Sequence, residues 1–147
     1  MADIKKDSEL LAEIYRNAHY ALESISDILP ETEDGEMCEE LKRMHDDYER
    51  ISGRAAQIAK DEGLELKEPG PIKKAMMWGS IKMNTMKDGS REHIAEMMTQ
   101  GTVMGITALA RSMGDCGENC DPEIRKLAEE LLKTEQDCEK RMKTYLN

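Results

Sequence analysis

Apolar residues recur at alternating steps of four and three along residues 37–58, and this spacing constrains the fold more than any other feature of the chain. Such steps place side chains on one side of an α-helix, whereas a half-buried strand would need strict alternation. The spacing therefore predicts a long amphipathic helix that buries one face against other helices. The stripe consists of Met37, Leu41, Met44, Tyr48, Ile51, Ala55 and Ile58.

Two further segments repeat the pattern near the two ends of the chain. The first predicted stripe contains Leu11, Ile14, Ala18, Ala21, Ile25 and Ile28. The last contains Ile124, Leu127, Leu131, Thr134, Cys138 and Tyr145, and only Arg141 interrupts it. Because no segment alternates with a period of two, we expect an all-α protein.

Residues that start or stop helices divide the chain into five predicted helices. Polar caps are expected at Asp7 or Ser8, at Ser90 and at Asp121, and prolines suited to a first helical position are Pro71 and Pro122. Helix ends are expected at Pro30, Gly63 and Gly114. The predicted ranges are about 8–29, 35–62, 71–87, 91–113 and 122–145.

Link lengths predict how the helices are connected. Short links make the first two helices antiparallel, and likewise the last two. The middle helix has about 16 residues, so it can climb roughly 24 Å and return the chain along the molecule. We expect a single domain over residues 1–147, a ferritin-like four-helix bundle with an additional short crossover helix. Cys38 should then lie at the end opposite Cys116 and Cys120.

Composition excludes several classes of partner. The chain carries 21 Lys and Arg against 31 Asp and Glu, a formal net charge of −10, which argues against general binding of nucleic acid or anionic membranes. Aromatic residues make up 3%, too few for base-stacking platforms. Residues 1–11 lack the apolar core of an export signal, and no apolar run of about 18 residues occurs. We expect a cytoplasmic protein that contacts neither nucleic acid nor membrane.

The stretch GPIKKAMMWGSIKMNTMKDGSREHIAEMM carries a more specific pattern. A glycine-rich entry at Gly70 is followed by Trp78, by Lys82 four residues later, and by the polar turn Asp88-Gly89-Ser90. In these features, and in helix order and length over roughly residues 8–145, the chain resembles a bacterial family of unknown function within the ferritin-like superfamily.

That resemblance implies a site for two metal ions, and the residues depart from it. Ferritin-like enzymes use a Glu from each of two helices and a Glu-x-x-His from each of the others. This sequence has no Glu-x-x-His; Gln100 and Thr102 stand where the related family has glutamates, and the nearest counterpart of the motif is Glu135-x-x-Cys138. We therefore expect that the di-iron centre is lost and that no cofactor is bound. The alternative is a degenerate site that holds iron or manganese.

Two helical pairs offer ligands for that alternative. His19 and Glu23 are four residues apart, as are His45 and Glu49, and in an antiparallel hairpin they would lie at similar heights. Imidazole and carboxylate suit a divalent metal. The other interpretation is two ordinary i,i+4 pairs on partly exposed helix faces.

Cys116 and Cys120 also admit two interpretations. A zinc site would need four ligands, and only Asp115, Glu118 and Asp121 are near in sequence. A reversible, redox-active disulfide fits the glycine-containing loop, but a cytosol would keep it reduced. Two exposed reduced thiols are the simpler expectation.

Eight of the 12 methionines fall between residues 76 and 113. They are core residues in a chain without Phe, or an adaptable binding face for partner helices, or soft ligands for Cu(I). Gly101 and Gly105 permit close helix approach, to another helix or to a second copy. With Met98 and Met104 they are the expected interface of a homodimer, and we expect the protein to act by assembly or by binding a partner or ligand rather than by catalysis.

Overall fold

The computed structural model describes residues 4–66 and 89–146. Within those ranges it contains four long α-helices and no strand, so the all-α prediction is confirmed. The crossover helix expected over residues 71–87 lies outside the described residues. The helices are α1 (Ile4–Ile28), α2 (Gly35–Glu62), α5 (Arg91–Cys116) and α6 (Pro122–Lys143), with a short 3-10 turn η1 (Leu29–Glu31) after α1.

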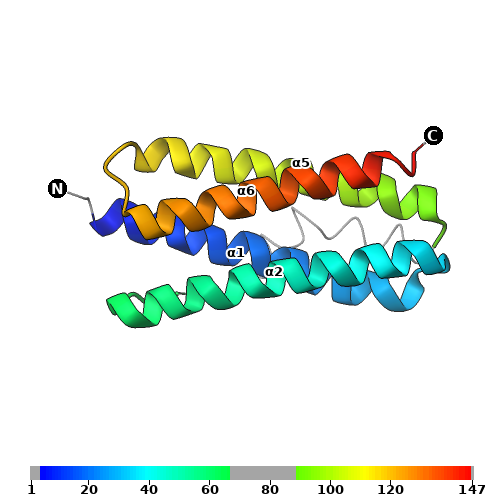
Figure 1. Cartoon of the computed structure of the whole chain (residues 1–147), viewed down its shortest axis with the longest axis horizontal. Coiled ribbons are helices and arrows are strands. Elements are labelled where there is room, and N and C mark those ends of the chain that lie inside the picture. The colour runs from blue at the N-terminus through cyan, green and yellow to red at the C-terminus, as the bar shows by residue number, and fades with distance from the viewer. Residues whose placement is uncertain (1–3, 67–88, 147) are drawn as a thin grey trace.

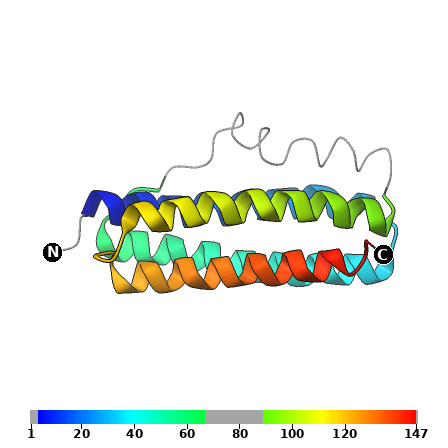
Figure 2. The ribbon, with the colours of Figure 1, turned by 90° about the horizontal axis from the view of Figure 1, so that it is seen from above.

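The four helices form an elongated bundle in which neighbours run antiparallel (Figure 1). In the view turned by 90°, α1 and α5 form one layer and α2 and α6 the other (Figure 2). Helix α1 packs against α2 and α5, and α6 packs against α5 and α2. Because α2 ends at one end of the bundle and α5 begins at the other, the chain must travel the bundle's length between them.

The two ends of the bundle separate the cysteines as predicted. The Cys38 thiol lies 3.5 Å from the carbonyl oxygen of Thr32, beside η1. At the opposite end, the Cys116 sulfur lies 3.6 Å from a carboxylate oxygen of Asp7, in the first turns of α1. These positions agree with the predicted order of helix directions.

Most predicted helix boundaries are confirmed by their caps. Asp34 accepts a hydrogen bond from the Met37 amide at 2.8 Å, and Gly63 ends α2 with a φ of 68°. Ser90 caps α5 by accepting from the His93 amide. Asp121 caps α6, and Pro122 occupies its first position.

Two predicted boundaries are wrong. Helix α1 already includes Ile4, so neither Asp7 nor Ser8 is its cap. Helix α5 continues through Gly114 to Cys116, because Gly117, with a φ of 75°, is the residue that leaves the helix. A glycine on an exposed helix surface costs some stability but does not by itself end the helix.

The predicted stripes of α1 and α2 form the core without exception. In α6 the buried face shifts by one residue, since Glu135 and Met142 are buried whereas Thr134 and Tyr145 are partly exposed. On α5 the core includes Met97 and Met98. The bundle centre thus contains the acidic side chain of Glu135, a position that the predicted stripe did not include.

The end of the bundle that holds η1 is closed by polar contacts. Arg91 donates to Asp34 at 2.8 Å, which lowers the pKa of that carboxyl, and its guanidinium lies 5.4 Å from the ring centre of Tyr145. Gly89 packs so closely on the carbonyl of Glu31 that a Cβ there would overlap it. These contacts join α5, α2 and the end of α6.

At Gly105, helix α5 lies close to side chains of α6 and α1. A Cβ at this position would overlap the Glu135 carboxylate and approach Asn17 Oδ1 to 3.0 Å. Because both neighbours are buried, we expect Gly105→Ala to lower the free energy of unfolding by about 1–3 kcal/mol. Gly53→Ala on α2 is the matched control, since a Cβ there would meet nothing within 4 Å, and it should raise stability by about 0.5–1 kcal/mol. Urea denaturation measures both, and a Gly105→Ala protein as stable as the native one would contradict the packing.

Candidate functional site

Cys116 and Cys120 form a disulfide that closes the turn between α5 and α6. Both residues are buried, 7% and 8% exposed, so the expectation of two exposed reduced thiols is wrong. The physical reason is the extra length of α5, which carries Cys116 into contact with the start of α1. Gly117 then reverses the chain so that Cys120 returns beside it.

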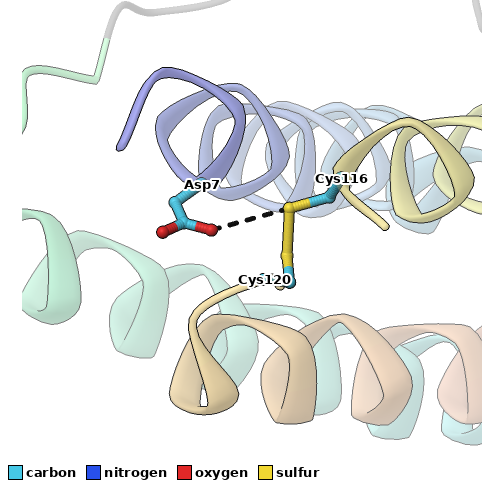
Figure 3. A group of neighbouring side chains, drawn as sticks. All are labelled: Asp7, Cys116 and Cys120. Atoms are coloured by element: carbon cyan, nitrogen blue, oxygen red, sulfur yellow. Dashed lines mark hydrogen bonds between the residues drawn. A yellow bond between two sulfur atoms is a disulfide. The ribbon is translucent and has the colours of Figure 1, made fainter. Parts of the chain in front are cut away.

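Asp7 lies against this disulfide from the first turns of α1 (Figure 3). Its Oδ1 accepts a hydrogen bond from the Asp121 amide at 2.9 Å and lies 3.6 Å from the Cys116 sulfur. A disulfide sulfur carries no hydrogen, so of these two neighbours the amide donates to Asp7 and the sulfur does not. After reduction, the Cys116 thiol could donate to the same oxygen. Ligand atoms of Asp7, Cys116 and Cys120 all lie within 4.8 Å of one another.

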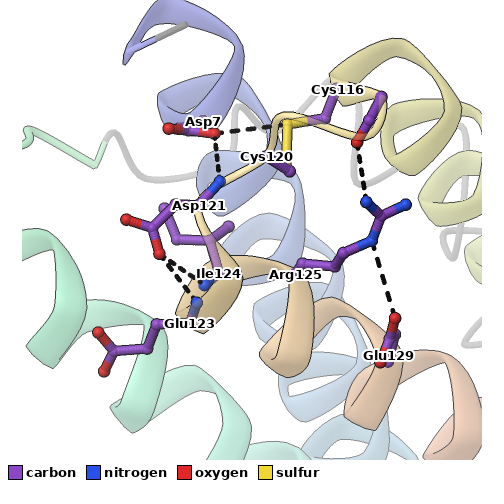
Figure 4. Close-up of a disulfide and its surroundings, with 9 residues drawn as sticks. Asp7, Cys116, Cys120, Asp121, Glu123, Ile124, Arg125 and Glu129 are labelled. Atoms are coloured by element: carbon purple, nitrogen blue, oxygen red, sulfur yellow. Dashed lines mark hydrogen bonds and ion pairs between the residues drawn. A yellow bond between two sulfur atoms is a disulfide. The ribbon is translucent and has the colours of Figure 1, made fainter. Parts of the chain in front are cut away.

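A second group of carboxylates lies at the same end of the bundle, and two of its members, Asp121 and Glu123, are seen at the start of α6 (Figure 4). Glu62, Asp121 and Glu123 bring carboxylate oxygens within 4.8 Å of one another. The pKa of Glu62 is raised, first by partial desolvation and then by the neighbouring Asp121 and Glu123. This end of the bundle is therefore electronegative and favours cations over anions.

Arg125 holds the turn that carries the cysteines. Its guanidinium donates to the carbonyl oxygen of Gly117 at 3.0 Å and lies 3.8 Å from Glu129 (Figure 4). The turn is thereby attached to α6 through a side chain as well as through the disulfide.

A second polar group lies inside the bundle. Glu135 on α6 is fully buried, and neither of its carboxylate oxygens has a hydrogen-bond partner among residues 4–66 and 89–146. Asn17 on α1 donates to the Gly105 carbonyl at 2.9 Å, while its own Oδ1 has no partner in the same ranges. Glu13, also on α1, is buried and paired with Arg16. Two carboxyls and an amide from two helices thus share the core.

Burial favours the neutral form of three side chains in this core, Glu135, Tyr48 and Cys138. The pKa of Glu135 is raised well above its usual value by desolvation and, secondarily, by the negative charge of Glu13. Desolvation likewise raises the pKa of Tyr48 strongly and that of the Cys138 thiol to about 12. A protonated Glu135 can donate its proton to a neighbouring acceptor, and a neutral thiol at Cys138 is a poor nucleophile.

The histidines proposed as metal ligands lie elsewhere. His19 contacts Glu23 at 2.9 Å and stacks on Tyr15, with ring centres 5.7 Å apart. His45 Nδ1 lies 3.9 Å from Asp46. Within the described ranges 4–66 and 89–146, no set of three ligand atoms from His19, Glu23, His45 and Glu49 converges within 4.8 Å. The i,i+4 contact on α1 is present, but the shared cluster is not.

The residues proposed for an interface divide between core and surface. Gly101, Gly105 and Met98 are buried inside the bundle, so they are not available to a partner. Met104 is 42% exposed and lies beside Val103, which is equally exposed. The expectation of an interface through the glycines is therefore wrong, whereas Met104 does face outward.

Sequence reasoning missed Asp7, Asn17 and the buried position of Glu135. The local pattern favours Asp7 as a helix cap. Asp7 lies beside Cys116 only because the fold brings together two residues that are about 110 positions apart in the sequence. For Glu135 a signal existed, since Leu131, Cys138 and Met142 continue a regular stripe through position 135.

Comparison of the chain with protein-family models, with curated proteins and with solved structures finds no match. No helix of the described part is both long and apolar enough to cross a bilayer.

Glu135→Gln tests the protonated state of the buried carboxyl. The folded protein retains a proton that the unfolded chain releases above about pH 4.5, the ordinary value for Glu. The bound proton therefore contributes fully to stability below that pH. As the pH rises toward the raised pKa of the folded state, the free energy of unfolding falls by at most about 1.4 kcal/mol per pH unit. Gln stays neutral, so the variant should lose this decline. Urea denaturation from about pH 5 to pH 8 measures it.

The control for this experiment is Glu49→Gln, which removes an exposed carboxyl from α2. This variant should keep the native pH dependence. If Glu135→Gln showed the same decline as the native protein, the carboxyl would not hold its proton in the folded state.

Proposed function

We propose that this protein is a cytoplasmic, ferritin-like helical bundle without a di-metal centre, which acts through self-assembly rather than catalysis. The direction of its helices supports the ferritin-like assignment, because one long connection joins two antiparallel pairs in such folds. The observation that carries the proposal of assembly is an exposed apolar face on α5.

The donors at the bundle centre do not fit two metal ions. Such centres take carboxylates or imidazoles from all four helices. Here α1 and α6 supply Glu13 and Glu135, whereas α5 presents Thr102 and Gly105 at its buried face. The Thr102 hydroxyl donates to the carbonyl of Met98 in its own helix, so it is already occupied.

The outward face of α5 differs from the rest of the surface. Residues 97–114 contain no Asp or Glu, although the whole chain has 31. The exposed positions in this stretch carry a single charge, that of Arg111. Val103, Met104, Thr107, Ala108 and Arg111 line a shallow open depression of about 320 Å³. Adjacent exposed apolar side chains without a carboxylate beside them make this face the candidate interaction surface of the described residues.

A second copy of the chain is the partner that this face fits. With a formal net charge of −10, two copies repel each other over most of their surface. A two-fold contact through α5 instead brings together two faces without carboxylates, and it covers both apolar patches at once. The small side chains at Thr107 and Ala108 allow the two helices to approach closely.

Val103→Glu with Met104→Glu tests the homodimer. The two carboxylates meet their copies across the two-fold contact, so the double variant should be monomeric when the native protein is dimeric. Sedimentation velocity at roughly tens of micromolar measures the mass. Ala56→Glu with Gln57→Glu, at neighbouring exposed positions on α2, adds the same negative charges and should leave the dimer intact. A monomeric native protein would overturn the proposal.

A further inference from the structure

The disulfide end of the bundle holds a set of donors that sequence spacing did not reveal. Two cysteine sulfurs from the α5–α6 turn and one carboxylate from α1 converge within 4.8 Å, and all three residues are buried (Figure 3). Thiolates with an oxygen ligand suit Zn²⁺, and two cysteines separated by three residues have a spacing found in zinc sites. In the oxidised state the sulfurs are bonded to each other and cannot act as thiolate ligands.

We propose that reduction of the Cys116–Cys120 disulfide creates a binding site for one Zn²⁺ ion, formed by both thiolates and the Asp7 carboxylate. The proposal is independent of the homodimer described above. A reducing dithiol supplies two electrons and two protons, so the S–S bond breaks into two thiols while the dithiol becomes a disulfide. Zinc then displaces both thiol protons to solvent and forms two Zn–S bonds and one Zn–O bond.

Electrostatics around the pair favour the metal-bound form over free thiolates. Asp7 lies against Cys116, and Asp121 and Glu123 follow in the same turn and the start of α6 (Figure 4). Glu62 brings a carboxylate oxygen within 4.8 Å of those of Asp121 and Glu123, and Glu123 is also paired with Arg54. Negative charge at this density disfavours two uncompensated thiolates, because like charges repel in a buried site. A dication reverses that effect, since it is attracted by the same carboxylates and compensates the thiolates that it binds.

The turn can adjust from disulfide to metal geometry without unfolding a helix. Cys120 lies outside both helices, in the segment between Gly117 and Asp121. Its sulfur can therefore move away from that of Cys116 while α5 and α6 stay in place. Asp7 remains directed at the site because its Oδ1 accepts from the Asp121 amide. Three protein ligands leave a fourth tetrahedral position for water.

Cobalt(II) provides the spectroscopic probe, since it occupies tetrahedral zinc sites and shows a thiolate-to-metal charge-transfer band. The full-length protein is reduced with an immobilised dithiol, kept anaerobic, and titrated with Co²⁺. We expect the band to reach its plateau at one equivalent per chain, to disappear on addition of one equivalent of Zn²⁺, and to be absent from the oxidised protein. A reduced native protein without the band would overturn the proposal.

Variants assign the three ligands. Cys116→Ser and Cys120→Ser should each abolish the plateau at one equivalent, and Asp7→Asn should weaken Co²⁺ affinity by at least about tenfold. Cys38→Ser, at the other end of the bundle, is the matched control and should bind Co²⁺ like the native protein. Persistence of the native band in both Cys116→Ser and Cys120→Ser, or unchanged affinity in Asp7→Asn, would contradict the assigned ligands.

A second measurement needs no variant, so it stands even if a substitution prevents folding. The reduced native protein is treated with iodoacetamide with and without Zn²⁺, and the modified cysteines are identified by mass spectrometry. Zinc should slow alkylation of Cys116 and Cys120 by at least about tenfold and leave Cys38 unchanged. Equal rates with and without zinc at Cys116 and Cys120 would overturn the proposal.

Discussion

The mutual burial of the apolar helix faces is the constraint on which the rest of the structure depends. Helices α1, α2 and α6 each carry an apolar stripe, α5 contributes Ile94, Met98 and Leu109, and in a bundle of this size these side chains can leave water only by facing a common axis. This requirement sets the rotation of every helix about its own axis. It therefore decides which polar side chains are carried inward and which apolar ones remain outside.

The rotation of α6 about its axis places the carboxyl of Glu135 in the core. With Leu131, Cys138 and Met142 directed to the core, position 135 must also face inward. A charged carboxylate without hydrogen-bond partners would be strongly unfavourable there, whereas a protonated one is far less so. Gly105 on α5 provides the room, because its missing Cβ leaves space that the carboxyl occupies. A glycine in one helix and an acidic residue in another thus form one packing unit.

Periodicity and caps were sufficient to predict the four helices of the described residues, because both are local properties of the chain. The stripe of α2 and the caps Ser90 and Asp121 are read correctly from neighbours within a few residues. The candidate site depends on contacts that no local rule contains. Asp7 meets Cys116 because two helix ends lie at the same end of the bundle, and the burial of both cysteines follows from that contact.

The difference between local patterns and tertiary contacts also explains why the sequence favours His19 and His45 as ligands although the fold does not bring them together. Both belong to regular i,i+4 patterns, and such patterns bring a residue close to its own helix neighbour, as in the contact between His19 and Glu23. A metal site needs donors from separate segments that converge on one point, which only tertiary packing provides. In the described part of this chain, convergence of cysteine with carboxylate occurs where three helix ends meet. There the loop can rearrange without disturbing the core, so a change in redox state can alter the local chemistry while the apolar packing holds the bundle together.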